Sequence, residues 1–265
     1  MLDPNRFDLR NPERMRALSR LVLQTFRRYH RAEVTGLGRI PDGPALYVGN
    51  HSGGLLSIDT FLAFAEVVLQ RGVEHAPYAL THSVIVRFPG INQVIVPLGA
   101  VEASRENADR LLEAGHKVLV YPGGDIETFR PFSQRHRVKF GGRRGWIRLA
   151  IRQGVPVVPV ATAGAHATFL VIDDMPWLAR LLGLQEKLRV QVWPLIFSIP
   201  WGLTVGPCPP YIPFPAKILT EFLDPIEFDR AGPEAASDDA YVDTCAYRVE
   251  ATMQKAIDRM AGRVL

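Results

Sequence analysis

The segment YVGNHSGGLLSID, residues 47–59, brings a histidine and a carboxylate close together in the chain. His51 follows a short apolar run and Asn50, and Asp59 lies eight positions further on. A neutral imidazole in a loop can take a proton from a hydroxyl group when a carboxylate fixes its tautomer and stabilises the imidazolium. The two residues are therefore a candidate catalytic pair. Alternatively, His51 only hydrogen-bonds its own loop, and Asp59 sits at the positive end of a helix that Ser57 caps.

Several other kinds of site lack support in this sequence. It contains no GxSxG, GxxxxGK[ST] or HExxH motif. The two cysteines, Cys208 and Cys245, form no CxxC pair, which argues against a disulfide framework or a cysteine metal site and favours a reducing, intracellular compartment. We expect no metal, and Cys245 is expected to pack in the core because it lies on the apolar stripe of a helix.

Positive charge is concentrated in two segments. Residues 1–40 hold nine arginines against four acids, and residues 130–152 hold eight Lys or Arg and no acid. Such segments suit membrane headgroups or phosphorylated cofactors, although a solvated face is an equally valid interpretation. Nucleic acid is not an expected partner, because no recognition motif accompanies the charge.

The order of elements favours an α/β fold. A helix is expected to begin after Asn11 and to pack its apolar stripe on the domain; the alternative is that the helix lies on an anionic membrane with this stripe toward the lipid. From residue 44 onward, short β-branched runs alternate with helical patterns, which predicts a mostly parallel central sheet flanked by helices. We therefore expect an N-terminal basic amphipathic helical segment (1–40), an α/β domain (41–265) and a long final helix from Ser237. Strands are predicted at 45–48, 94–97, 117–121 and 155–160, and helices at 58–69, 105–113 and 146–153.

Three unusual loops follow predicted strands: NHSGG after Val48, PGGDIE after Tyr121 and TAGAH after Val160. Ligand sites of parallel sheets collect where strands end at their carboxyl edge. We therefore expect the chemistry of this protein at these loops. His166, in the third loop, is expected to be a structural histidine.

Residues 190–216 carry no charge but contain seven prolines. Proline removes helix hydrogen bonds, so a transmembrane helix is a poor interpretation. A hairpin bearing Trp and Phe can instead dip into the membrane interface or line an acyl-chain groove. Because the first ten residues carry acids and no apolar core, no signal peptide is expected there. These features predict a cytoplasmic protein attached peripherally to the inner membrane face.

Four blocks within residues 45–165 resemble those of the glycerolipid acyltransferase superfamily, the lysophosphatidate-acyltransferase-like proteins. Asn50-His51 with a downstream aspartate resembles the family's Asn-His, four residues and Asp. The segment GAVEASR, residues 99–105, resembles its glycine with an arginine six positions later. YPGGDIE, residues 121–127, stands in place of Phe-Pro-Glu-Gly-Thr-Arg, and VPVVPV, residues 155–160, is similar to the closing apolar strand.

The chain departs from this pattern in two places. Leu56 occupies the position of the family aspartate, so Asp59 is the nearest candidate partner of His51, with Asp125 or Glu127 as the alternative orienting carboxylate. Ile126 stands where the family has an arginine. The resulting Pro-Gly-Gly-x-x-Glu form is similar to the branch of diacylglycerol acyltransferase-like and phytyl-ester-synthase-like proteins, whose acceptors are neutral alcohols.

The resemblance implies an O-acyltransferase of lipid metabolism, with no bound cofactor and no acyl-enzyme. His51 would activate a hydroxyl of a glycerolipid or other lipophilic alcohol, which attacks the thioester of acyl-CoA or of an acyl-carrier protein. The substrate-binding residues would be Arg105, for a phosphate, together with Asn50, Glu127 and the backbone N–H groups of Gly123 and Gly124, which face the developing oxyanion. The alternatives are an acyl ester or thioester hydrolase and a lipid-binding protein without activity.

Overall fold

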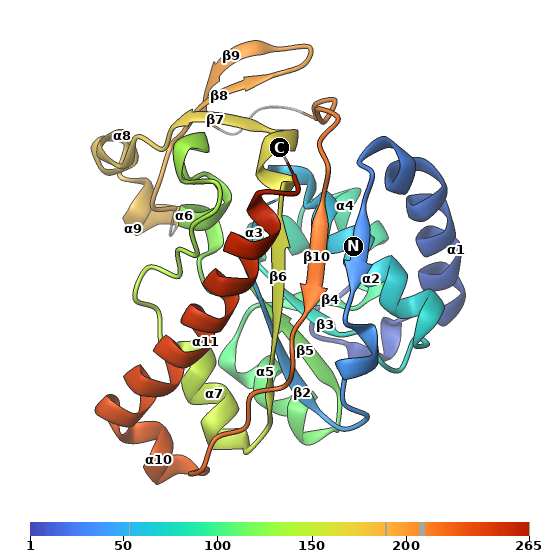
Figure 1. Ribbon diagram of the computed structural model, residues 1–265, viewed down its shortest axis with the longest axis vertical. Helices are drawn as coiled ribbons and strands as arrows, with labels where there is room; N and C mark the ends of the chain where they lie inside the picture. Colours follow the sequence, from blue (N-terminus) through green and yellow to red (C-terminus); the bar gives the residue numbers. More distant parts are fainter. Residues whose placement is uncertain (53, 189, 207–209, 265) are drawn as a thin grey trace.

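The computed structural model describes residues 1–52, 54–188, 190–206 and 210–264. A seven-stranded sheet forms its centre, in the order β1-β10-β6-β2-β5-β3-β4 (Figure 1). Five strands from β6 to β4 are parallel, whereas β10 runs antiparallel to β6 and carries β1 beside it. The strands span Glu33–Thr35 (β1), Ala45–Gly49 (β2), Tyr78–Thr81 (β3), Ala100–Glu102 (β4), Lys117–Val120 (β5), Val157–Ala163 (β6) and Leu219–Phe222 (β10). The predicted α/β class with a mostly parallel sheet is thus confirmed.

Both faces of this sheet are covered by helices. In β2, Leu46 and Val48 pack toward α5, α7 and α11, while Ala45 and Tyr47 pack toward α1 and α2. This alternation follows from the two-residue period of a strand, and burial of both faces explains the nearly continuous apolar sequence of the inner strands. The main helices span Pro12–Val22 (α1), Ile58–Gln70 (α2), Arg105–Glu113 (α5), Gly145–Gln153 (α7), Pro233–Ser237 (α10) and Asp239–Ala261 (α11).

The helix starts show which local signals act. Asn11 caps α1 through hydrogen bonds from the N–H groups of Glu13 and Arg14, both 3.0 Å long, and α1 packs on α2 as predicted. Ser57 precedes α2 but has left-handed backbone (φ 45°) and makes no side-chain cap, so the predicted cap is wrong. Cys245 is buried in α11 as expected, whereas Cys208 lies outside the described residues.

The predicted strand at 94–97 is wrong. Those residues belong to helix α4 (Ile91–Ile95) and to a following 3-10 turn, and the strand of this region is β4, which begins at Ala100. A short helix, α3 (Ser83–Val86), precedes them. A proline at the start of a 3-10 turn is tolerated, since its missing N–H would be unpaired there anyway.

A second, three-stranded sheet projects beyond the carboxyl edge of the central one (Figure 1). Its antiparallel strands are β7 (Leu170–Asp173), β8 (Leu195–Ser198) and β9 (Gly202–Val205), with the short helices α8 (Pro176–Leu181) and α9 (Leu184–Leu188) between β7 and β8. The uncharged, proline-rich segment thus forms a hairpin. None of the helices in the described part of the chain is long and apolar enough to cross a bilayer.

Candidate active site

His51 lies just beyond the carboxyl end of β2, and its ring stacks on that of Tyr121, which follows β5. The ring centroids are 4.6 Å apart and the planes are inclined by 29°. Val48 pairs with Val120 in the sheet, so the next residues of the two strands, Gly49 and Tyr121, lie side by side. A Cβ atom on Gly49 would come within 2.4 Å of the Tyr121 ring. The glycine therefore makes room for the stack.

The buried ion pair of Glu127 and Arg130 holds the backbone of His51 by two hydrogen bonds. The N–H of His51 donates to Oε2 of Glu127 (2.9 Å), and its carbonyl accepts from Nη1 of Arg130 (3.0 Å). Glu127 and Arg130 are fully buried, with Nη1 and Oε1 3.9 Å apart. Oε1 of Glu127 also accepts a hydrogen bond from the N–H of Lys139 at 3.1 Å. The two charges thus position the loop rather than the imidazole itself.

Asn50 and Ser52 fix the same loop on either side of His51. The Asn50 amide donates to the carbonyl of Thr162 and accepts from its N–H (2.9 and 2.8 Å), which ties the end of β2 to β6. It also donates to the Ser52 hydroxyl at 2.9 Å, and Nη2 of Arg130 donates to that hydroxyl at 3.0 Å. Asn50 therefore has a positioning role in this structure.

Asp59 lies in the first turn of α2 and is buried. Burial raises the pKa of Asp59 to about 6, against the opposing effect of hydrogen bonds from the N–H groups of Thr60 and Ser52. Asp59 is thereby tied to the residue after His51. Its Oδ1 and the Nδ1 of His51 are both buried without a hydrogen-bond partner in the described part of the chain, so these two atoms are not paired with each other in this structure.

Tyr121 connects the two halves of the site. Its ring lies against His51, and its hydroxyl makes a 2.6 Å hydrogen bond with the hydroxyl of Thr60, next to Asp59. Burial and the Asp59 charge raise the pKa of Tyr121 far above its ordinary value, so its hydroxyl stays protonated. Tyr121 is therefore a neutral side chain that packs against His51 and bonds Thr60 through its hydroxyl.

The ring of His51 is neutral at physiological pH. Burial lowers the pKa of His51 to about 4, and the guanidinium of Arg130 adds to this effect. At pH 7 the site therefore combines a free imidazole with an ionised Asp59, the protonation states that a proton-accepting histidine and its stabilising carboxylate need. His166 differs: its Nε2 is 2.6 Å from the carbonyl of Arg130, and burial lowers its pKa to about 3, which fits the predicted structural role.

Glu127 links the Pro-Gly-Gly turn to His51, because its side chain lies against Gly123 and accepts a hydrogen bond from the N–H of His51. A Cβ on Gly123 would come within 2.6 Å of Oε2 of Glu127 and of the Lys139 carbonyl, so only glycine fits. Gly124 has a φ of +52°, and its N–H donates to the carbonyl of Tyr121 at 3.1 Å. In the described chain the N–H of Gly123 has no hydrogen-bond acceptor. Of the two predicted oxyanion donors, Gly123 is therefore the one whose N–H is available.

Two predicted site residues lie away from His51. Asp125 accepts hydrogen bonds from the N–H of Gln191 and from Nη2 of Arg143 (3.4 Å), so its carboxylate is engaged elsewhere. Arg105 begins α5 after β4 and lines a separate pocket that His51 does not line. Asn50, His51, Asp59, Gly123, Gly124 and Glu127 are the predicted residues that gather at the ends of β2 and β5.

Sequence reasoning missed Tyr121 and Arg130 as parts of this site. Arg130 was counted only within the basic segment, yet its guanidinium makes five hydrogen bonds, to the carbonyls of His51, Glu127, Gln134 and Arg135 and to Ser52. The available signal was its spacing: Arg130 stands three positions after Glu127, just beyond the short helix Gly124–Thr128, and this spacing brings opposite charges side by side.

The mostly parallel sheet thus carries His51 at the end of β2 and the Pro-Gly-Gly turn at the end of β5, the neighbouring strand. The chain belongs to the diacylglycerol acyltransferase family, whose model matches residues 8–240. The predicted membership of the glycerolipid acyltransferase superfamily is thereby confirmed.

Known proteins of two kinds are similar to this chain in sequence. An uncharacterized protein of Mycobacterium tuberculosis is 29% identical over 240 residues, 90% of this chain and 64% of that protein. A mouse protein named "DGAT1/2-independent enzyme synthesizing storage lipids" is 27% identical over 202 residues, 76% of this chain and 54% of that protein. This chain therefore spans less than two thirds of the length of these relatives.

The fold has a solved counterpart. The 1-acyl-sn-glycerophosphate acyltransferase PlsC of Thermotoga maritima superimposes with a TM-score of 0.56 at 19% identity, covering 93% of this chain and 79% of that protein. At this identity the similarity supports the fold.

Proposed function

We propose that the protein transfers a fatty acyl group from an acyl thioester to a hydroxyl of a glycerolipid or other lipophilic alcohol. The observation that carries the proposal is the neutral, half-buried His51 at the carboxyl edge of the sheet: neither its Nδ1 nor the Oδ1 of Asp59, in the first turn of α2, has a hydrogen-bond partner among the described residues. Membership of the diacylglycerol acyltransferase family supports it independently.

In the proposed reaction, His51 removes the proton of the acceptor hydroxyl as the oxygen attacks the thioester carbon. The new ester bond forms, the carbon–sulfur bond breaks, and the thiol leaves with the proton that His51 carried. No acyl-enzyme is needed, because the alcohol attacks directly. General base catalysis of this kind contributes about 10²–10⁴ in rate.

Asp59 would stabilise the imidazolium that forms during attack. An imidazolium in this buried setting is costly, as the pKa of His51 near 4 implies. Closing the gap between Nδ1 of His51 and Oδ1 of Asp59 would satisfy both unpartnered atoms, and hydrogen bonds of catalytic groups commonly tighten only when substrate binds. Substrate-induced pairing of these two atoms is therefore part of the proposal.

The negative charge on the thioester oxygen needs a fixed donor. Gly123 is buried next to Glu127, which holds the His51 backbone, and its N–H is free of a described acceptor, so we assign it this role. Arg143 holds the turn in place, because its Nη1 donates to the carbonyls of Pro122 and Gly123 at 2.9 and 3.1 Å.

The acceptor is proposed to be a neutral lipid alcohol. Ile126 stands in the third block instead of an arginine, and among described residues within hydrogen-bond reach of the His51 loop the only guanidinium is that of Arg130, which is saturated by backbone carbonyls and Ser52. A phosphorylated acceptor would therefore find no free cation there.

Release of thiol from acyl-CoA tests the function. The purified protein is incubated with acyl-CoA alone and with monoacylglycerol, diacylglycerol or a long-chain alcohol, and free thiol and new ester are measured. Ester formation coupled to thiol release is expected only with an acceptor. Thiol release at the same rate without any acceptor would instead indicate a hydrolase, and saturable lipid binding without turnover would indicate a binding protein.

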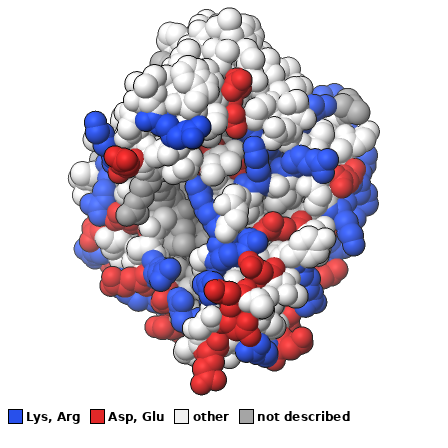
Figure 2. All heavy atoms as spheres, turned by 90° about the vertical axis from the view of Figure 1, so that its left-hand side faces the viewer, with Lys and Arg blue, Asp and Glu red and all other residues white. Residues whose placement is uncertain are grey.

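Peripheral attachment to a membrane, on the cytoplasmic face, completes the proposal. The projecting sheet and α8–α9 carry large apolar side chains that are each more than a third exposed, and the top of the molecule in Figure 2 is mostly white, with a few red and blue side chains below it. We call this surface the apolar cap. The cap consists of Ile172, Trp177, Leu181, Leu182, Leu188, Phe197, Ile199, Trp201, Leu203, Val205 and Ile212. A second exposed apolar strip, on α3, α4 and Phe88, follows the carboxyl end of β3.

Exposed apolar surface of this extent marks an interaction site. The hairpin β8–β9 is uncharged over its length and bears Trp201 near its tip, and tryptophan favours the membrane–water boundary. The cap follows β6 at the same edge of the sheet as His51, so a bilayer at the cap would present lipid alcohols on the side where the base lies.

A further inference from the structure

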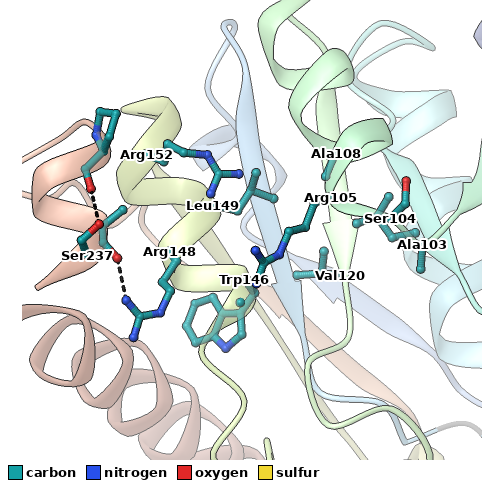
Figure 3. Close-up of a pocket in the computed structure, with 14 residues that line it drawn as sticks. Ala103, Ser104, Arg105, Ala108, Val120, Trp146, Arg148, Leu149, Arg152 and Ser237 are labelled. Carbon is teal, nitrogen blue, oxygen red and sulfur yellow. Dashed lines mark hydrogen bonds between the residues drawn. The ribbon is translucent and has the colours of Figure 1, made fainter. Parts of the chain in front are cut away.

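Two pockets lie apart from His51, and their charged groups are paired to different extents. In the first, between α5, α7 and α10 (Figure 3), Arg148 and Arg152 form ion pairs with Asp239 and Asp109. The second has a volume of about 630 Å³ and lies at the amino edge of the central sheet, where β3 and β5 begin. We call it the amino-edge pocket. It is separate from the proposed acyl-transfer site, which lies at the carboxyl edge.

Lys117 is a buried cation of the amino-edge pocket. It begins β5, lines the pocket and is only 3% exposed. Its Nζ donates to the carbonyl of Asp42 at 2.8 Å, and no carboxylate of the described chain lies within ion-pair distance. Burial lowers the pKa of this ammonium group. A buried charge without a counter-ion is costly, and one carbonyl uses only one of its three donors, so an anion in the pocket would offset part of this cost.

Two further nitrogen-bearing side chains line the same pocket. The guanidinium of Arg10 donates through Nη2 to the carbonyls of Val73 and Ala76, at 3.3 and 2.6 Å, and forms no ion pair with the residues that the structure describes. Nδ1 of His75 is buried without a hydrogen-bond partner in the described chain. Burial and the charge of Lys117 lower the pKa of His75, so its ring is neutral at pH 7. The pocket thus combines two unpaired cations with a neutral imidazole, and all three can donate to an anion.

The carboxylates that line this pocket are exposed to solvent. They belong to Asp8, Asp42 and Glu74. Asp8 forms an ion pair with Arg6, and Asp42 lies 3.7 Å from Nη2 of Arg71. Water and salt screen exposed charges strongly, whereas buried charges are screened much less. The buried ammonium of the pocket therefore acts on a ligand more strongly than the carboxylates around it.

We propose that the amino-edge pocket binds a small, water-soluble phosphate monoester. Such a group carries a charge of about −1.5 to −2 at neutral pH and three acceptor oxygens, which match two cations and an imidazole donor. The volume is in the range that holds a small-molecule ligand, and Phe7, Met15 and Tyr78 provide an apolar side for its organic part. This inference goes beyond the proposed function, because it concerns a second ligand at the opposite edge of the sheet.

Three other ligands fit less well. A metal ion would face the two unpaired cations, and no group of three His, Cys, Asp or Glu side chains in the described part of the chain could hold one. A monocarboxylate carries one charge and would leave one cation unpaired. A phosphorylated lipid would be held in a bilayer, yet no residue of the apolar cap lines the pocket.

Calorimetric titration of the whole chain tests the assignment without turnover. The probes are glucose 6-phosphate, AMP, inorganic phosphate and succinate. At least one of the two esters is expected to bind tenfold or more tightly than inorganic phosphate and succinate, since only an ester fills both the charged and the apolar side. Inorganic phosphate that binds as tightly as either ester would overturn the assignment of an ester. Succinate that binds as tightly, or no binding of any probe, would overturn the proposal altogether.

Lys117→Met identifies the pocket as the place of binding. It removes the buried charge while keeping the length of the side chain, and it is expected to weaken ester binding more than tenfold. The matched control is Lys217→Met, because Lys217 is also partly buried and begins no part of this pocket: it lies before β10 and pairs with Glu33. Its ester affinity should equal that of the wild type. Unchanged ester binding in Lys117→Met would refute the pocket.

Thermal unfolding separates binding from folding. A ligand that binds only the folded protein raises its Tm, so the ester should raise the Tm of the wild type and of His51→Ala but not that of Lys117→Met. Should Lys117→Met fail to fold, His75→Leu provides the second test, since it removes an imidazole donor and is expected to weaken ester binding at least threefold. Full ester affinity in His75→Leu would then count against the proposal. Binding in His51→Ala would stand even if the transfer assay failed.

Discussion

The imidazole of His51 and the phenol of Tyr121 lie face to face, 4.6 Å between centroids, across the ends of two paired strands. The stack holds the imidazole ring at the edge of the sheet while the backbone of His51 is fixed separately by Glu127 and Arg130. One ring nitrogen, Nδ1, is left without a described partner. The ring stack and the two backbone hydrogen bonds thus position the residue, while Nδ1 stays available for the proposed pairing with Asp59.

Replacing His51 by alanine is expected to lower kcat by about 10²–10⁴-fold, the usual contribution of a general base. The measurement is ester formation from acyl-CoA and a lipid alcohol. His116→Gln serves as the control, because His116 lies between α5 and β5, apart from the His51 loop. Full activity of His51→Ala would eliminate this histidine as the base.

Asp59→Asn is expected to reduce kcat by about a hundredfold or more with a nearly unchanged KM. It keeps the side-chain shape but cannot stabilise the imidazolium. Asp125→Asn is the matched comparison, since that carboxylate accepts hydrogen bonds from the N–H of Gln191 and from Arg143 and makes none with the His51 loop among the described residues. If Asp125→Asn caused the larger loss, Asp125 would replace Asp59 as the orienting carboxylate.

The pKa of Asp59 gives the activity a predicted pH dependence. Asp59 titrates at about 6 and His51 at about 4, so His51 is already neutral where Asp59 begins to lose its proton. The value of kcat/KM should therefore rise with pH through an inflection near 6 and level off above 7. In Asp59→Asn this inflection should vanish. A wild-type profile that is flat between pH 5 and 7.5 contradicts the assignment.

Much of the framework could be predicted from local sequence. The helix from Arg105 to Glu113 has the predicted bounds because Ser104 caps it and its apolar positions recur at helical spacing. Strands β2 and β5 are short apolar runs between clear turn signals. By contrast, β4 is a three-residue edge strand, Ala100–Glu102, whose residues have weak strand preference, and the more β-branched segment 94–97 before it misled the prediction.

The site was predictable only in part, because some of its contacts arise between segments that are distant in the sequence. Asn50, His51 and Gly123 could be found because each stands in a loop of unusual composition after a strand. The role of Tyr121 depends on the register that pairs Val48 with Val120, and that of Arg130 on burial among distant carbonyls. Sequence spacing along one segment carries no information about contacts that arise between strands.

Removing the charge of Arg130 is expected to destabilise the protein. Arg130→Met would leave Glu127 buried without its counter-ion and would abolish five hydrogen bonds, at a cost of about 3–5 kcal/mol in the free energy of unfolding. Denaturant titration measures the loss. The double variant Glu127→Gln with Arg130→Met should recover part of it, because no buried charge then remains unpaired. A single variant as stable as the wild type would show that the pair is dispensable.

Introducing charge into the apolar cap should release the protein from membranes. Leu203 is 64% exposed on β9 and Trp201 is 49% exposed just before it, so Trp201→Glu with Leu203→Glu should lower the free energy of unfolding only by about 1 kcal/mol, for the lost hydrogen bond from Trp201 Nε1 to the carbonyl of Pro210. Binding to phosphatidylcholine–phosphatidylglycerol vesicles, measured by co-sedimentation, should fall more than tenfold, because two apolar side chains no longer enter the interface and two anions face lipid. Tyr247→Glu is the control, since Tyr247 is 73% exposed on α11, outside the cap, and its variant should bind vesicles as the wild type does. Transfer to a short, water-soluble alcohol should persist in the cap variant, because the His51 loop is intact. Vesicle binding that survives both glutamates would place the membrane contact elsewhere on the molecule.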